Sequence, residues 1–177
     1  MHSPVFFAVK QCCAACSNSM VIVRIPLPGV SSQGLSRFAE RARRAAKVSG
    51  TVGVLVTSSR EMRRLNKRFR KKDKPTDVLS FLPGNEFVAQ AAGDLAISAQ
   101  IAAANARRLG HSTSDEIKVL ILHGMLHLAG YDHERDHGEM ARKEERLRKA
   151  LGLPGGLIAR SGRPVRRPRS TFQGANP

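Results

Sequence analysis

The feature that most limits how this sequence can fold is a stretch from residue 117 to 129 that is apolar at almost every position. A helix with apolar residues all around it, rather than along one stripe, must be surrounded by other elements. Thr113 and Glu116 have the spacing of a capping box at its start, and Gly130 can end it in a left-handed conformation. We therefore predict a central, buried helix over about 113–129.

The rest of the chain alternates between strand-like and helix-like patterns, and 177 residues suffice for one core. Short β-branched and apolar runs predict strands over 21–25, 51–57, 78–82 and 94–97. Apolar residues at helical spacing predict further helices over 35–46, 58–69, 98–109 and 135–151. We expect a single domain.

The two ends of the chain differ from this body. Residues 1–19 precede a second methionine, Met20, and contain no acidic residue. We interpret them as an upstream extension, with an organelle transit segment as the alternative and the cytoplasm as the default location. The domain then spans 20–152, and 153–177 form a basic, flexible tail. No apolar run reaches the roughly 18 residues of a membrane span, so no membrane partner is expected.

Three histidines lie within eleven residues around the end of the central helix: His123, His127 and His133. Positions 123 and 127 project from one face of a helix, one turn apart, and a turn at Gly130 can bring His133 to the same ion. Unpaired imidazoles on a buried helix would be costly, which argues against incidental core histidines. Three imidazoles leave a fourth position for water, as in catalytic zinc sites, although imidazole also suits nickel, copper and iron. We predict one Zn²⁺ here.

The residue after His123 indicates which class of zinc enzyme is disfavoured. Zinc proteases with two histidines at this spacing carry a glutamate there, which acts as the general base. Gly124 cannot accept a proton, so a protease of that type is disfavoured. His2 and His111 have no partner at ligand spacing, and we interpret them as incidental. His137 follows His133 by one helical turn, but we interpret it as a surface residue of the last helix.

The charge of the chain points to a polyanionic partner. It has 30 Lys+Arg against 14 Asp+Glu, a net charge of +16, which favours capture of nucleic acid. The densest segment, Arg60 to Lys74, holds nine basic and two acidic residues, a net +7. Such density is suited to phosphate contacts, which give affinity with little sequence preference. A solvated helix end and loop is the alternative interpretation.

Three separated blocks resemble the YbeY family of bacterial and organellar endoribonucleases. They are Leu65 to Phe81 (LNKRFRKKDKPTDVLSF), Gly93 to Ser98 (GDLAIS) and the histidine motif (HGMLHLAGYDH), and the resemblance covers about 20–152. It implies one α+β domain, a small mixed sheet of about four strands packed by about five helices, with zinc at the end of a central helix. The chain departs from the family at Lys71, where glycine is common, and at Leu82, where proline is frequent.

The resemblance also implies a zinc-dependent, single-strand-specific endoribonuclease. Such enzymes act in ribosomal RNA processing, notably at the 16S 3′ end, and in ribosome quality control. By this resemblance His123, His127 and His133 are the metal ligands, and Arg70 is the functionally important arginine. Arg70 and His123 are therefore the expected catalytic residues. Precursor ribosomal RNA is the expected partner, with the small subunit or assembly proteins as further candidates. The substrate phosphates are expected to contact Arg68, Arg70, Lys71, Lys72 and Lys74.

As a mechanism we hypothesise that zinc lowers the pKa of its bound water, and that the resulting hydroxide, or a 2′-hydroxyl that it activates, attacks a phosphodiester held by the basic segment. Arg70 would stabilise charge on the phosphoryl oxygens through its planar guanidinium. Asp132 and Glu134 lie near the ligands and are candidates for supporting them. One alternative is a non-catalytic RNA-binding assembly factor with a structural zinc. A metal-dependent hydrolase of peptides or small molecules is another, disfavoured by Gly124 and by the charge.

Overall fold

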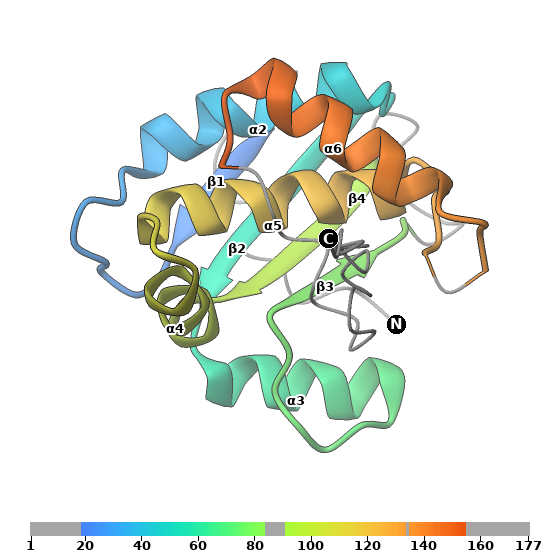
Figure 1. The fold of residues 1–177 in the computed structure, drawn as a ribbon. Coiled ribbons are helices and arrows are strands. Elements are labelled where there is room, and N and C mark those ends of the chain that lie inside the picture. The colour runs from blue at the N-terminus through green and yellow to red at the C-terminus, as the bar shows by residue number, and fades with distance from the viewer. Residues whose placement is uncertain (1–18, 84–90, 134, 155–177) are drawn as a thin grey trace, which may run out of the picture.

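The centre of the protein is a four-stranded sheet with the order β1-β2-β4-β3. The computed structural model describes residues 19–83, 91–133 and 135–154. β1 and β4 both pair with β2 in parallel, whereas β3 runs antiparallel to β4 (Figure 1). The strands are β1 (Met20–Val23), β2 (Thr51–Thr57), β3 (Val78–Phe81) and β4 (Ala91–Ser98). The expected mixed sheet of four strands is confirmed.

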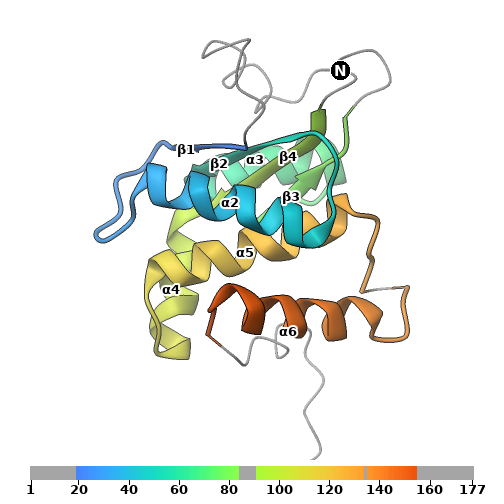
Figure 2. The ribbon, with the colours of Figure 1, turned by 90° about the horizontal axis from the view of Figure 1, so that it is seen from above.

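Within the described residues, five helices pack around this sheet and complete the expected α+β fold. They are α2 (Ser32–Ala46), α3 (Ser59–Arg70), α4 (Ala99–Leu109), α5 (Thr113–Leu128) and α6 (Glu139–Leu151). Seen from above, α2 lies over α5 and α6 runs alongside them (Figure 2). None of these helices is long and apolar enough to cross a membrane.

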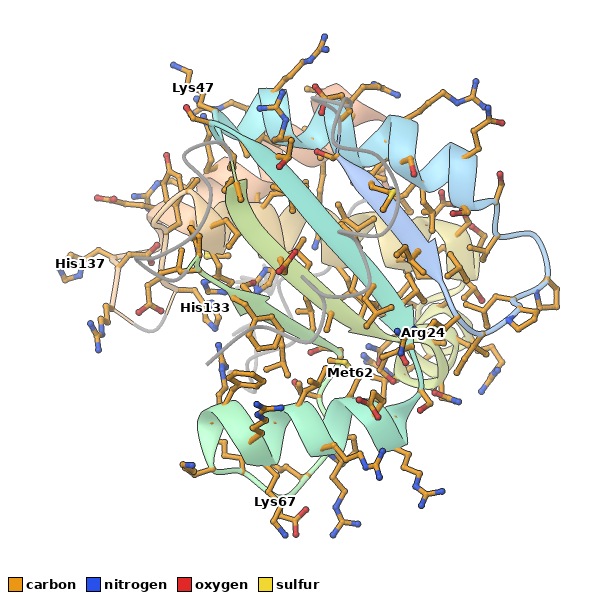
Figure 3. All side chains as sticks on the ribbon, turned by 180° about the vertical axis from the view of Figure 1, so that it is seen from behind. Arg24, Lys47, Met62, Lys67, His133 and His137 are labelled. Carbon is orange, nitrogen blue, oxygen red and sulfur yellow. The ribbon has the colours of Figure 1, made fainter. Side chains whose placement is uncertain are left out.

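The two faces of the sheet enter separate apolar clusters, because successive side chains of a strand point to opposite faces. Val54 and Leu95 belong to the larger cluster, which they share with α2, α5 and α6. Leu55, the neighbour of Val54 on the opposite face, packs with Met62 of α3 in the smaller one. Figure 3, seen from behind, shows α3 along the β3 side of this second face.

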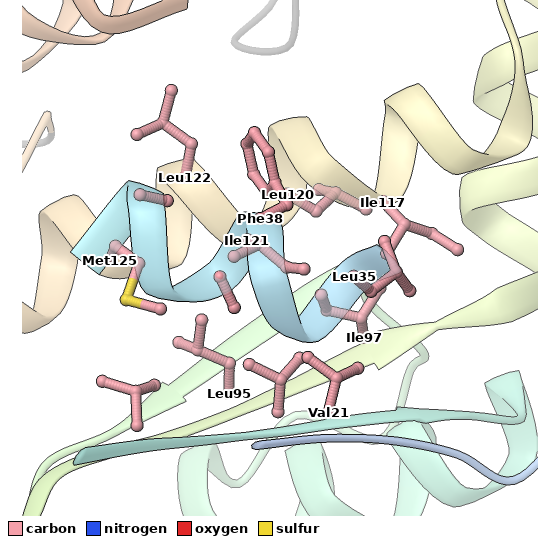
Figure 4. Packing of buried hydrophobic residues seen from close by; sticks show 14 of the residues in the cluster. Val21, Leu35, Phe38, Leu95, Ile97, Ile117, Leu120, Ile121, Leu122 and Met125 are labelled. Atoms are coloured by element: carbon pink, nitrogen blue, oxygen red, sulfur yellow. The ribbon is translucent and has the colours of Figure 1, made fainter. Parts of the chain in front are cut away.

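Helix α5 is the central helix that its apolar sequence predicts. It contacts α2, α4, α6 and the strands β3 and β4, and most of its side chains are buried. Figure 4 shows Leu120, Ile121 and Met125 packed among residues of α2 and the sheet. Full burial of a side chain of this size contributes about 1.5–3 kcal/mol. The position of α5 is therefore fixed on several sides, which makes it a rigid support for the residues near its end.

The start of α5 corrects two predictions. The N-cap is Ser112, not Thr113, since the Ser112 hydroxyl accepts a hydrogen bond from the Asp115 backbone N–H at 3.0 Å. Glu116 therefore does not close a capping box; it is fully buried, and its Oε2 lies 2.9 Å from Nε2 of His111. His111 is thus not incidental but joins the α4–α5 connection to the helix.

The last helix begins later than predicted, at Glu139 rather than near Arg135. Gly138 precedes it with a φ of +83°, and the Asp136 carboxylate accepts hydrogen bonds from the N–H groups of Gly138 and Met140. These contacts form a turn that breaks the helical pattern. His137 is exposed as predicted, but it precedes the helix.

Some predictions concern parts of the chain outside the described residues. These are the extension over residues 1–18, the turn at Gly84, and the tail from 155 onward. Ser19 is described, and its N–H and hydroxyl both donate to the Glu40 carboxylate of α2.

Candidate metal centre and basic segment

The structure brings together the three histidines that the sequence singles out. His123 and His127 are half-buried on consecutive turns of α5, and His133 is exposed in the loop that follows. Gly130 adopts a φ of +90°, and the backbone N–H of Tyr131 bonds to the carbonyl of Leu126, so the chain turns back over the helix end. As a result, one nitrogen from each imidazole lies within 4.8 Å of the other two.

The donor set fits a single transition-metal ion. Nε2 of His123 and Nε2 of His127 face each other at 3.2 Å. Two nitrogen ligands at about 2.05 Å from a tetrahedral zinc would be about 3.3 Å apart, so little movement is needed to share an ion. Burial lowers the pKa of His127, and nearby His123 and His133 lower it further. His127 is therefore held in the neutral form that a metal requires.

A carboxylate that the sequence does not single out completes this centre. Oε2 of Glu144 in α6 lies 2.9 Å from Nδ1 of His123, and its Oε1 accepts a hydrogen bond from the buried Arg148. Burial alone would raise the pKa of Glu144. The hydrogen bond from His123 and the charges of His123 and Arg148 outweigh this and lower it. In the sequence, Glu144 and Arg148 form only a helical i,i+4 pair, so nothing there points to His123.

The position after His123 has a packing reason to be glycine. Gly124 is buried against β4, and a Cβ there would lie 2.6 Å from Cδ2 of Leu95. A glutamate at this position would have to displace the buried side chain of Leu95, so packing as well as the sequence disfavours the general base of the zinc proteases. Of the two acids near the ligands, Asp132 lies 3.5 Å from Arg135, and Glu134 is outside the described residues.

The end of the basic helix α3 lies at the same end of the molecule as the histidines. Phe69, near the last turn of α3, packs edge-on against Phe81 of β3, with ring centroids 5.0 Å apart. Gly93 of β4 lies close to the Phe81 carbonyl and to the side chain of Leu128, the residue after His127 in α5. Figures 1 and 3 agree with this placement: the last turn of α3, the end of β3 and His133 occupy one side.

Ion pairs divide the basic segment into two groups. Arg63 and Lys67 are both engaged by Asp73, at 2.7 and 3.0 Å, and Arg64 pairs with Glu61 at 3.4 Å. The other basic side chains of the segment from Arg60 to Lys74 are exposed and form no ion pair with a described residue. They are Arg60, Arg68, Arg70, Lys71, Lys72 and Lys74. Five of these six are the residues predicted to contact phosphates.

The loop after α3 is held against the helix. The Asn66 amide donates to the Lys74 carbonyl at 2.7 Å, and Lys71 ends the helix in a left-handed conformation with φ +59°. Its N–H donates to the Asn66 carbonyl. This conformation explains why glycine suits the position, since glycine adopts positive φ without steric cost. The departure from the family pattern at Lys71 therefore leaves the turn itself intact.

The chain is similar to known sequences over most of its length. The family model described as Endoribonuclease YbeY matches residues 30–152. A protein from Koribacter versatilis named Endoribonuclease YbeY is 56% identical over 148 residues, covering 84% of this chain and 95% of the relative. One of the same name from Solibacter usitatus is 50% identical over 126 residues, covering 71% and 83%.

A solved structure has the same fold. The solution structure of TM1509 from Thermotoga maritima matches with a TM-score of 0.52 and 30% identity, over 75% of this chain and 89% of that one. The family model covers the three histidines, which lie between residues 30 and 152 of this chain. The chain belongs to the YbeY family of endoribonucleases.

Proposed function

We propose that this protein is a metal-dependent endoribonuclease that hydrolyses phosphodiester bonds in precursor ribosomal RNA. One observation carries the proposal: three convergent imidazoles lie on the same side of the molecule as the last turn of α3, where Arg68 and Arg70 are exposed and form no ion pair with a described residue. The first group is suited to a catalytic metal and the second to RNA phosphates. Family membership supports the same activity.

In this proposal His123, His127 and His133 hold one ion. Zinc is the metal that three imidazoles with an open fourth position fit best. When bound, it supplies Lewis acidity and a water of lowered pKa. The protein supplies the geometry of the site. Helix α5 and the turn at Gly130 hold the three histidines close together before the metal binds, so binding requires little movement of their side chains.

Arg70 is the residue proposed to act on the scissile phosphate. It is the last residue of α3, exposed, and free of any ion pair with a described residue. Its planar guanidinium can donate to two phosphoryl oxygens and stabilise the charge that develops there. Arg68, Lys71, Lys72 and Lys74 are proposed to bind neighbouring phosphates, which fixes the strand without reading its sequence.

The biological setting follows from the family resemblance. We propose action on single-stranded segments, at the 16S 3′ end and in ribosome quality control, with the small subunit or its assembly proteins as partners and the cytoplasm as the location.

We also propose that residues 20–152 suffice for activity, with 1–19 and 153–177 as appendages. Removal of those two segments is expected to leave the cleavage rate of a short RNA within about threefold.

The test compares wild-type protein with His123→Ala and Arg70→Ala on a structured ribosomal RNA fragment, with cleavage and binding measured side by side. His123→Ala is expected to abolish cleavage and keep the affinity for RNA. Arg70→Ala is expected to lower cleavage by about 10²-fold or more. Arg37→Ala, which removes another exposed arginine, on α2, is the matched control and is expected to cleave normally.

Two outcomes would overturn the proposal. Full cleavage by His123→Ala would remove the metal from the reaction. Binding without cleavage by metal-loaded wild type would leave a non-catalytic RNA-binding assembly factor with a structural zinc as the better description.

A further inference from the structure

A carboxylate from the last helix contacts His123 on the ring nitrogen that faces away from the other two histidines' candidate metal position. Helix α6 packs beside α5, and Oε2 of Glu144 lies 2.9 Å from Nδ1 of His123. The Glu144 side chain is only 14% exposed, so this contact is largely protected from water. The opposite ring nitrogen of His123, Nε2, faces His127. One side of the imidazole is thus held by α6 while the other points to the metal position.

The chemistry of this contact sets the proton on His123. An ionised carboxylate can only accept hydrogen bonds, so this contact requires a proton on Nδ1; in the neutral imidazole the lone pair then lies on Nε2. We propose that Glu144 is the positioning residue for His123: it fixes the Nδ1–H tautomer and the ring orientation that present Nε2 to the metal. Carboxylates that hold ligating histidines in this way raise metal affinity. This inference rests on the proposed function, because it concerns the same metal.

Arg148 holds Glu144 in turn. It is a buried arginine, 5% exposed, and its Nη2 donates to Oε1 of Glu144. A buried guanidinium without a partner is costly, so Glu144 compensates the charge of Arg148. In return, the hydrogen bond from Arg148 orients the Glu144 carboxylate. The resulting relay runs from Arg148 through Glu144 to His123 and joins α6 to α5. Neither of these two α6 residues needs to contact the RNA or the metal to affect the site.

The variant that tests this role is Glu144→Gln, since truncation would leave Arg148 buried and unpaired. Glutamine keeps the size of the side chain but has only one acceptor oxygen, because its amide nitrogen is a donor. It can therefore accept a hydrogen bond from His123 or from Arg148, but not from both through separate oxygens as Glu144 does. The matched control is Glu145→Gln, one residue further along α6. Glu145 is 53% exposed and pairs with Lys149 at 3.2 Å on the solvent side. Both variants remove one negative charge, so they change the net charge of the protein equally.

The first measurement is Zn²⁺ affinity of the metal-free proteins, obtained by competition with a chromophoric chelator, together with the visible spectrum of the Co²⁺ forms. Glu144→Gln is expected to bind Zn²⁺ about 10–100-fold more weakly and to alter the Co²⁺ spectrum, whereas Glu145→Gln matches the wild type. Equal affinity of the two variants would refute the positioning role. Wild type that takes up no metal would instead overturn the proposed function, and this inference with it.

A second measurement needs no variant and covers the case in which Glu144→Gln does not fold. Long-range ¹⁵N–¹H correlation spectra of the metal-free wild type report the tautomer of each histidine directly. The expected result is that His123 carries its proton on Nδ1. A proton on Nε2 of His123 would contradict the proposal.

Discussion

Replacement of Gly93 by alanine should destabilise the protein severely, because two independent costs meet at this residue. Gly93 has a φ of +139°, which side-chain-bearing residues rarely adopt. A Cβ there would also lie 2.4 Å from the Phe81 carbonyl oxygen and 2.8 Å from Cδ2 of Leu128. Backbone is the nearer obstacle, so β3 would have to move away from β4, or α5 away from the sheet.

The magnitude follows from these two costs. Strain at an unfavourable positive φ costs about 1–3 kcal/mol, and overpacking of a close contact costs about 1–3 kcal/mol. We therefore expect Gly93→Ala to lose about 2–6 kcal/mol, a large share of a typical stability of about 5–15 kcal/mol. Gly110 is the control, since it has a φ of +74° and a Cβ added there would meet no atom within 4 Å. Gly110→Ala should lose only about 1 kcal/mol.

The assay is equilibrium unfolding in urea for the two variants and the wild type, monitored by circular dichroism. The difference between the two variants reports the contact with Phe81 and Leu128 together with the greater strain at a φ of +139° than at +74°. If Gly93→Ala loses no more stability than Gly110→Ala, then β3, β4 and α5 do not approach one another as closely as the structure indicates. Because Leu128 follows His127, the folded fraction of Gly93→Ala is also expected to bind metal more weakly.

Three further predictions concern other parts of the fold. Lys71→Gly should raise the free energy of unfolding by about 0.5–1 kcal/mol in urea titrations, because Lys71 has a φ of +59°, while Lys72→Gly should not. Gly124→Glu should lose about 4 kcal/mol or more, or fail to fold, since a buried carboxylate would meet Leu95; soluble yield and urea unfolding measure this. The hydrogen bond from Arg43, followed by those from Arg44 and Ser19, lowers the pKa of Glu40 to about 2 despite burial. Because the pKa of Glu40 is lower in the folded than in the unfolded protein, its ionised carboxylate stabilises the fold above pH 4.5, and this stabilisation is lost as the pH falls toward 2. Glu40→Gln should therefore lower the free energy of unfolding by on the order of 1–2 kcal/mol at pH 7. That difference should vanish between about pH 4.5 and 2 in thermal unfolding, and a constant difference would contradict it.

The elements that the sequence predicts well are those with a strong local pattern. The apolar helix around His123 and His127 forms where expected, because its residues have no stable alternative to burial. The turn at Gly130 is also local, since glycine alone adopts its φ easily. The convergence of the three histidines follows from these two features together.

The features that sequence reasoning misses depend on contacts between distant segments. Glu144 reaches His123 only because α6 packs beside α5, and nothing in the spacing of residues 21 positions apart encodes that contact. Likewise, Asp136 accepts backbone hydrogen bonds that delay the start of α6, although the pattern from residue 135 is compatible with a helix. Asp73 shows the same limit in the basic segment, since charge counting cannot tell that it engages both Arg63 and Lys67.

Metal dependence of RNA cleavage is tested most directly by titrating metal-free protein with Zn²⁺ while the cleavage rate of a ribosomal RNA fragment is recorded. We expect no cleavage without metal and a rate that rises with occupancy of the three histidines to a plateau at one ion per chain. RNA affinity should stay nearly constant throughout, because the basic segment does not bind the metal. Cleavage at full rate by the metal-free protein would show that the three histidines do not serve catalysis through a metal.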